Sequence, residues 1–107
     1  MIFIRYYKDL IVEDNIDIIK AKKLFSKGIS LFNVYAICVS PKTNGLMEIM
    51  STENLLKEVN SYGNYGIIAL VKGRDKARKK SMRLIENWLV THSDLTGFKS
   101  HYNLNSF

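Results

Sequence analysis

The sequence predicts an α+β fold of the ferredoxin-like class, extended by one additional C-terminal helix. Segments of strand type alternate with segments in which apolar residues recur at helical spacing, in the order β-α-β-β-α-β-α. The first six elements match the ferredoxin-like pattern, an antiparallel sheet with helices on one face. The seventh either covers the other face or extends the helical layer. A winged helix, with residues 32–51 forming the wing, is the alternative.

The first strand and the first helix are predicted at residues 2–8 and at about 16–29. Residues 2–8 are rich in aromatic and β-branched types, as strands are. Asp14 or Asn15 can cap the helix, because their side-chain oxygens accept hydrogen bonds from first-turn N–H groups. One helical stripe is expected to be buried, and it comprises Ile18, Ala21, Phe25 and Ile29.

A hairpin and a second helix follow. Residues 32–40 and 46–51 predict two strands joined by a turn at 41–45, where Asn-Gly tolerates the positive φ that hairpins require. Ser51 or Thr52 can cap the short helix after them. The apolar side of this helix comprises Leu55, Leu56, Val59 and Tyr62.

The last strand and the last helix are predicted at residues 67–71 and 74–91. The strand is an unbroken apolar run, which is typical of a strand buried on both faces. The core side of the helix is expected to comprise Ala77, Ser81, Ile85, Trp88 and Leu89. Residues 93–107 predict an irregular tail, and the whole chain, 1–107, predicts a single domain.

Composition narrows the class of protein. The chain has 107 residues, of which 47% are hydrophobic and 24% are charged, as in ordinary globular domains. Its one cysteine, Cys38, excludes an internal disulfide and fits a reducing compartment. No apolar run approaches the roughly 20 residues that a membrane helix needs. We therefore expect a cytoplasmic protein that does not associate with membranes.

The net charge of +6 is concentrated in one short segment. Residues 72–83 hold seven basic residues and one acidic residue, 7 − 1 = +6, whereas the other residues hold nine of each sign. Such a concentration creates a local positive field, which favours an anionic partner such as nucleic acid, an anionic membrane or an acidic protein.

The basic residues of the last helix are therefore the first candidate binding site. Lys and Arg near a helix N-terminus oppose the helix dipole, so their placement favours binding over stability. A solvated helix face without a specific role is the alternative interpretation. The predicted nucleic-acid contacts on this helix are Arg74, Lys76, Arg78, Lys79, Lys80 and Arg83.

The hairpin turn is the second candidate contact. Lys42, Thr43 and Asn44 at its tip could reach a DNA backbone or groove edge. Ordinary turn chemistry explains the same residues.

Two further patterns could extend a nucleic-acid surface. A row of lysines on the first helix could enlarge the basic surface if the first and last helices are neighbours; this row is Lys20, Lys23 and Lys27. An exposed Phe3-Arg5-Tyr7 row on the first strand could stack bases. Coverage of that row by the last helix or a second subunit is the simpler expectation.

No pattern in the sequence indicates catalysis, a metal site or a cofactor. Cys38 lies among apolar strand residues, which predicts a buried and inert thiol. The two histidines, His92 and His101, do not form a recognised metal-binding spacing with it.

These observations predict a small, non-enzymatic nucleic-acid-binding protein with an accessory or regulatory role, binding DNA in preference to RNA. Because one short patch contributes little affinity, a homodimer presenting two patches is expected. The alternative function is a protein-binding regulator or inhibitor from a plasmid or phage.

Overall fold

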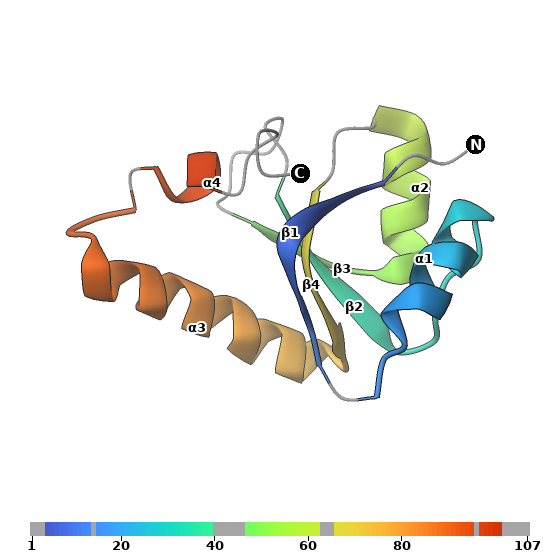
Figure 1. The fold of residues 1–107 in the computed structure, drawn as a ribbon, viewed down its shortest axis with the longest axis horizontal. Helices are drawn as coiled ribbons and strands as arrows, with labels where there is room; N and C mark the ends of the chain where they lie inside the picture. Colours follow the sequence, from blue (N-terminus) through green and yellow to red (C-terminus); the bar gives the residue numbers. More distant parts are fainter. Residues whose placement is uncertain (1–3, 14, 40–46, 63–65, 96, 102–107) are drawn as a thin grey trace.

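The structure is a computed structural model that describes residues 4–13, 15–39, 47–62, 66–95 and 97–101 (Figure 1). Its elements follow the predicted order, with a short helix added at the end. They are β1 (Arg5–Val12), α1 (Ile18–Ser26), β2 (Val34–Val39), β3 (Glu48–Ser51), α2 (Thr52–Tyr62), β4 (Gly66–Lys72), α3 (Arg74–Thr91) and α4 (Phe98–His101).

The four strands form a mixed sheet in the order β1-β4-β2-β3. β4 pairs in parallel with β1 and antiparallel with β2, and β3 pairs antiparallel with β2. A ferredoxin-like sheet instead holds its first strand inside and its last strand at an edge. The predicted ferredoxin-like order is therefore not the observed one, although the α+β class is. β4 is the most apolar strand, and a central position gives it neighbours on both sides.

The winged-helix alternative also differs from the structure. Its wing would be a hairpin beside the helices, whereas β2 lies inside the sheet between β4 and β3. The pairing of β2 with β4 runs from Val34 opposite Lys72 to Val39 opposite Gly66, with one irregularity after Ile37.

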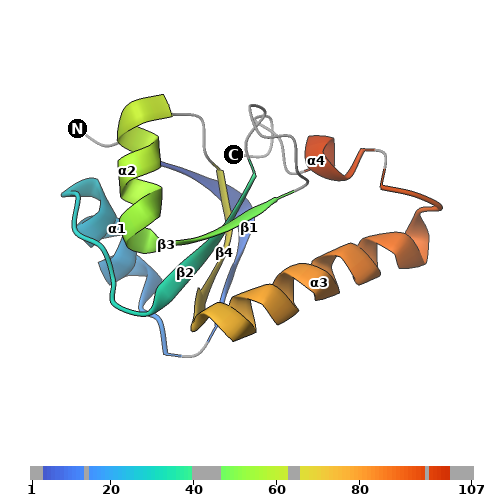
Figure 2. The ribbon, with the colours of Figure 1, turned by 180° about the vertical axis from the view of Figure 1, so that it is seen from behind.

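Helices cover both faces of the sheet, which makes three layers (Figures 1 and 2). α1 and α2 pack on one face, where Phe25 and Leu55 are fully buried. α3 and α4 pack on the other, where Ile37 and Phe98 are fully buried. The additional helix thus covers the second sheet face, one of the two predicted positions. Because both faces are covered, Ile67–Val71 are all buried, as their apolar run predicted.

Local hydrogen bonds set the beginnings of the helices. α1 is capped by Asp17, whose Oδ1 accepts a hydrogen bond from the N–H of Lys20 at 3.1 Å. The predicted cap at Asn15 is therefore wrong, since Asn15 turns the chain with a φ of 58°; Asp14 lies outside the described residues. At α2, Ser51 Oγ accepts from the N–H of Asn54 at 3.2 Å, which confirms one of the two predicted caps.

The C-terminal part differs from the prediction in two details. α3 has the predicted bounds, but Leu84 rather than Leu89 faces the sheet, and Leu89 is 44% exposed. Within the segment predicted to be irregular, α4 forms one turn and buries Phe98 edge-on against Trp88, with ring centres 5.4 Å apart. Among the described residues, no helix combines the length and apolar character needed to cross a membrane.

Candidate nucleic-acid interface

The candidate interface begins at the junction between β4 and α3. Gly73 occupies the N-cap with a φ of 85°, a conformation that glycine adopts without strain. Its N–H donates to the carbonyl of Asn33 at 2.8 Å, which ties the turn to the start of β2. Gly73 provides no side-chain hydrogen bond to cap the start of α3. In the first turn of the helix, Arg74, Asp75 and Lys76 are all exposed to solvent.

Four cations of α3 gather around one carboxylate. Residues three, four and seven positions apart share a helix face. Here that face is turned away from Ala77, which is buried against the sheet. Together with Glu13, the four cations line a shallow hollow of about 160 Å³, and they are Lys76, Lys79, Lys80 and Arg83. The structure thus brings together four of the predicted contacts.

Glu13 neutralises part of this charge. Its Oε1 lies 3.4 Å from Nζ of Lys80, and the two side chains are only 32% and 22% exposed. Counting Glu13 with residues 72–83, the group carries 7 − 2 = +5. The predicted contact at Lys80 therefore has an internal competitor, while the positive field persists over the rest of the helix face.

Sheet topology explains how Glu13 reaches α3. Because β1 and β4 run in parallel, their C-terminal ends meet at one edge of the sheet, where α3 begins. The N–H of Glu13 donates to the carbonyl of Leu70 at 3.1 Å, which extends the pairing by one residue. Sequence reasoning missed Glu13, since its approach to Lys80 depends on the pairing of strands far apart in the chain.

The remaining cations of the basic segment divide between two places. Arg74 and Arg78 are exposed on α3, on the flank nearer to the sheet. Lys72, which precedes the helix, lines a second hollow on the side of α1. The segment is thus not one continuous patch in space.

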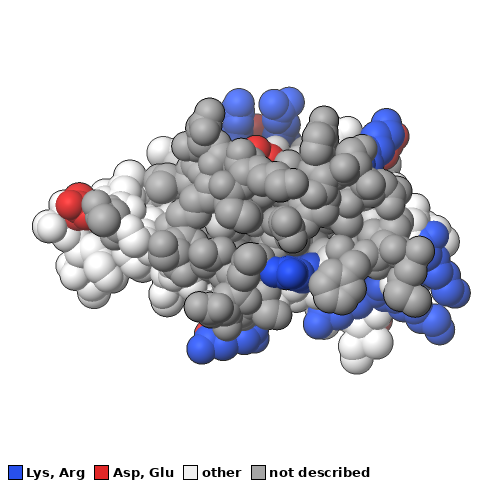
Figure 3. All heavy atoms as spheres, turned by 90° about the horizontal axis from the view of Figure 1, so that it is seen from above, with Lys and Arg blue, Asp and Glu red and all other residues white. Residues whose placement is uncertain are grey.

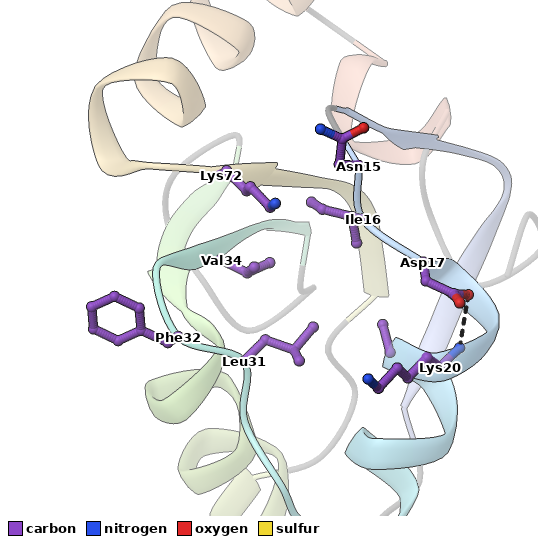
Figure 4. Close-up of a pocket in the computed structure, with 9 residues that line it drawn as sticks. Asn15, Ile16, Asp17, Lys20, Leu31, Phe32, Val34 and Lys72 are labelled. Atoms are coloured by element: carbon purple, nitrogen blue, oxygen red, sulfur yellow. Dashed lines mark hydrogen bonds between the residues drawn. The ribbon is translucent and has the colours of Figure 1, made fainter.

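The second hollow lies between the start of α1, the chain before β2 and the end of β4 (Figure 4). Its volume is about 280 Å³, slightly below the roughly 300 Å³ at which small-molecule pockets usually begin. Leu31, Val34 and Ile16 supply apolar walls, and Lys72 extends toward Ile16. Phe32 points away from the hollow and is 98% exposed.

The predicted lysine row on α1 does not join the basic face of α3. The hairpin tip, Lys42, Thr43 and Asn44, lies outside the described residues. The row on α1 (Lys20, Lys23 and Lys27) lies across the sheet from α3, because the two helices pack on opposite faces. In Figure 3, basic side chains seen from above form several separate groups around the outline of the molecule.

The aromatic residues of β1 are covered rather than presented for stacking. Tyr7 is 8% exposed, and its hydroxyl lies 3.1 Å from Nε2 of His101 in α4. Burial, together with the carboxylate of Asp9, raises the pKa of Tyr7. On the other sheet face Tyr6 lies beneath Nζ of Lys22, 4.7 Å from the ring centre, and burial raises its pKa to about 12. Phe3 lies outside the described residues.

The cysteine and histidines occupy structural positions. Cys38 is 1% exposed, and burial, with a smaller effect of Glu48, raises the pKa of its thiol. The ring of His92 stacks on Trp88 at 3.7 Å between ring centres. Within the described part of the chain, no three His, Cys, Asp or Glu side chains are grouped closely enough to hold a metal ion.

Comparison with protein-family models gave no match, and comparisons with curated proteins and with solved structures gave no significant similarity.

Proposed function

We propose that this protein binds nucleic acid, DNA in preference to RNA, through the exposed basic face of α3, and that it acts without catalysing a reaction. The observation that carries the proposal is the gathering of Lys76, Lys79, Lys80 and Arg83 on one outward face with Glu13 as the acid that lines it. Arg74 and Arg78 add two exposed cations on the adjacent flank.

The spacing of these cations suits a phosphate backbone. Successive turns of a helix are about 5.4 Å apart, so Lys76, Lys79 and Arg83 form a row that can follow several phosphates. Each contact releases condensed counterions, which makes binding favourable at low salt and weaker as salt rises. These side chains reach phosphates rather than base edges, so the predicted binding depends little on sequence.

The covered aromatic residues favour duplex over single-stranded ligands. Single-stranded bases are held by stacking on exposed aromatic rings. On β1, Tyr7 is buried beneath α3 and α4. The hollow on the basic face of α3 is lined by cations and Glu13, with no aromatic ring among the described residues that line it, and Phe32, which is 98% exposed, lies outside it. Such a face is better matched to the charged exterior of a double helix than to unstacked bases.

Fluorescence anisotropy with a labelled duplex tests the proposal at two or more salt concentrations. The Lys79→Gln/Arg83→Gln variant should lose affinity and flatten the plot of log K against log salt by about 0.9 for each lost phosphate contact. Lys23→Gln/Lys27→Gln is the matched control, since it removes the same charge from exposed positions across the sheet.

Equal losses in both variants would show that net charge, not the α3 face, governs binding. The absence of binding to duplex or single-stranded nucleic acid even at low salt would overturn the proposal. An acidic protein surface would then be the better ligand for the same cations, which is the protein-binding alternative.

A further inference from the structure

An exposed apolar stripe runs along α3 beside its basic face. Met82 is 61% exposed, Leu89 is 44% exposed, and Ile85 between them is half-buried. At about 100° per residue, this stripe lies roughly a quarter-turn from the side buried against the sheet. The second half of α3 also projects past the strands in both ribbon views (Figures 1 and 2). The stripe is therefore open to a partner.

The spacing of the stripe is that of a helix-pairing seam. Arg78, Met82, Ile85 and Leu89 follow one another at intervals of four, three and four residues. This is the alternation by which apolar residues face a second helix in a coiled coil. In a monomer this seam leaves apolar surface exposed to water, which is unfavourable, whereas pairing with a second helix would bury that surface.

We infer that α3 pairs antiparallel with α3 of a second copy of this chain. In this arrangement Met82 lies opposite Ile85 of the second copy, and Ile85 lies opposite Met82 of the second copy. At either end of the seam, Leu89 packs against the aliphatic stem of Arg78 from the other chain. The contact is the same on both chains, as two-fold symmetry requires.

Charge complementarity selects the antiparallel direction and a second copy as the partner. Lys79 and Glu86 flank the seam on its outer side, and neither forms an ion pair with another described residue. Antiparallel pairing brings Lys79 beside Glu86 of the second copy, and the two-fold axis creates this pair twice. Parallel pairing would instead bring Arg74 beside Lys79 of the second copy, where like charges repel.

The pairing also places the two basic faces together. The buried side and the basic side of α3 lie on opposite sides of the seam, and a two-fold axis perpendicular to antiparallel helices preserves that arrangement. Both rows of Lys76, Lys79 and Arg83 therefore face one side of the dimer, away from both sheets. The self-association does not depend on the proposed function. In the dimer Arg78 and Lys79 take part in the pairing, so each chain would present chiefly Lys76 and Arg83 to a polyanion on that side.

Sedimentation velocity without nucleic acid, over about 1 µM to 1 mM protein, tests the pairing. Because the seam is short, the expected result is a reversible monomer–dimer equilibrium in the micromolar range. Met82→Glu should yield a monomer throughout. Val90→Glu is the matched control, because Val90 is 81% exposed on the same helix but lies outside the seam, and it should dimerise like the wild type.

A charge exchange tests the direction of pairing. Lys79→Glu and Glu86→Lys should each weaken dimerisation by about tenfold, since each converts two opposite-charge pairs into like-charge pairs. The double variant Lys79→Glu/Glu86→Lys should restore it. Far-ultraviolet circular dichroism shows that each variant is folded.

A wild-type protein that stays monomeric to the highest concentration would overturn the inference. So would a dimer that Met82→Glu leaves intact, or a double variant no better than the two single ones. Salt-sensitive binding of duplex by a purely monomeric protein would refute the dimer alone and leave the proposed function standing. A dimer that binds no nucleic acid would refute the proposed function and leave the pairing of α3 standing.

Discussion

Replacing Glu13 by Gln should strengthen nucleic-acid binding, although it removes a native ion pair. The Glu13 carboxylate lies 3.4 Å from the Lys80 ammonium and forms an ion pair with it. Without the negative charge, Lys80 becomes available to one further phosphate. Each phosphate contact steepens the salt dependence by about 0.9, so one added contact is worth about eightfold in affinity at ~0.1 M salt, relative to 1 M.

The cost in stability should be small. Partly exposed ion pairs contribute about 0.2–1 kcal/mol, and Gln keeps nearly the same shape as Glu. Anisotropy titrations of wild type and Glu13→Gln between about 0.05 and 0.3 M salt would measure both affinity and slope. Urea unfolding of the same samples would measure the change in stability.

Glu53→Gln is the matched control for this change. Glu53 forms an ion pair with Lys57 at 3.7 Å on α2, across the sheet from α3. The control therefore loses the same charge and the same type of interaction away from the proposed interface. If Glu13→Gln binds no more tightly than Glu53→Gln, Lys80 and Glu13 lie outside the interface, and the reasoning from the α3 hollow fails.

Three further predictions concern the folded core. Phe98→Ala should lower the free energy of unfolding, measured in urea, by about 3–4 kcal/mol, because Phe98 of α4 is fully buried. Leu95→Ala, at a 36% exposed site, should lower it by under ~1 kcal/mol. Equal losses in the two variants would contradict the packing of α4 on the core. Thr52→Val should lower the free energy of unfolding by about 1–3 kcal/mol, because the buried Thr52 hydroxyl makes two hydrogen bonds. It accepts from the N–H of Leu31 and donates to the carbonyl of Leu31, both at 2.8 Å. Thr52→Ser keeps the hydroxyl and should keep most of that stability. Burial raises the pKa of the Cys38 thiol, so the unfolded chain loses a proton above about pH 8.5 that the folded chain keeps. The free energy of unfolding should therefore fall as the pH rises through this value, and the fall should be smaller in Cys38→Ala; an identical pH dependence in both proteins would refute this explanation.

The elements that the sequence predicted well are those with strong local signals. Gly73 marks the start of α3, and helix-forming residues continue through the span that the structure confirms as Arg74–Thr91. The uninterrupted apolar run of β4 likewise predicted its burial on both faces. In both segments neighbouring residues alone contain the information.

The predictions of the buried face of α3 and of the N-cap of α1 were wrong in part, because contacts between segments far apart in the chain decide both. Leu84 and Leu89 both lie near the apolar side of α3, and only contact with the sheet and α4 determines which is buried. Asn15 and Asp17 are both good capping residues, but a left-handed turn at Asn15 moves the helix start to Asp17. Local propensity could not separate these pairs of alternatives.

By itself, the sequence determined the α+β class, the bounds of α3 and the concentration of positive charge in residues 72–83, because each follows from residues adjacent in the chain. The tertiary structure alone decided that β4 enters the sheet between β1 and β2. That pairing brings Glu13 to Lys80 and separates α1 from α3. Strand order depends on which buried surfaces find partners across long stretches of chain, and such contacts leave no local pattern to read.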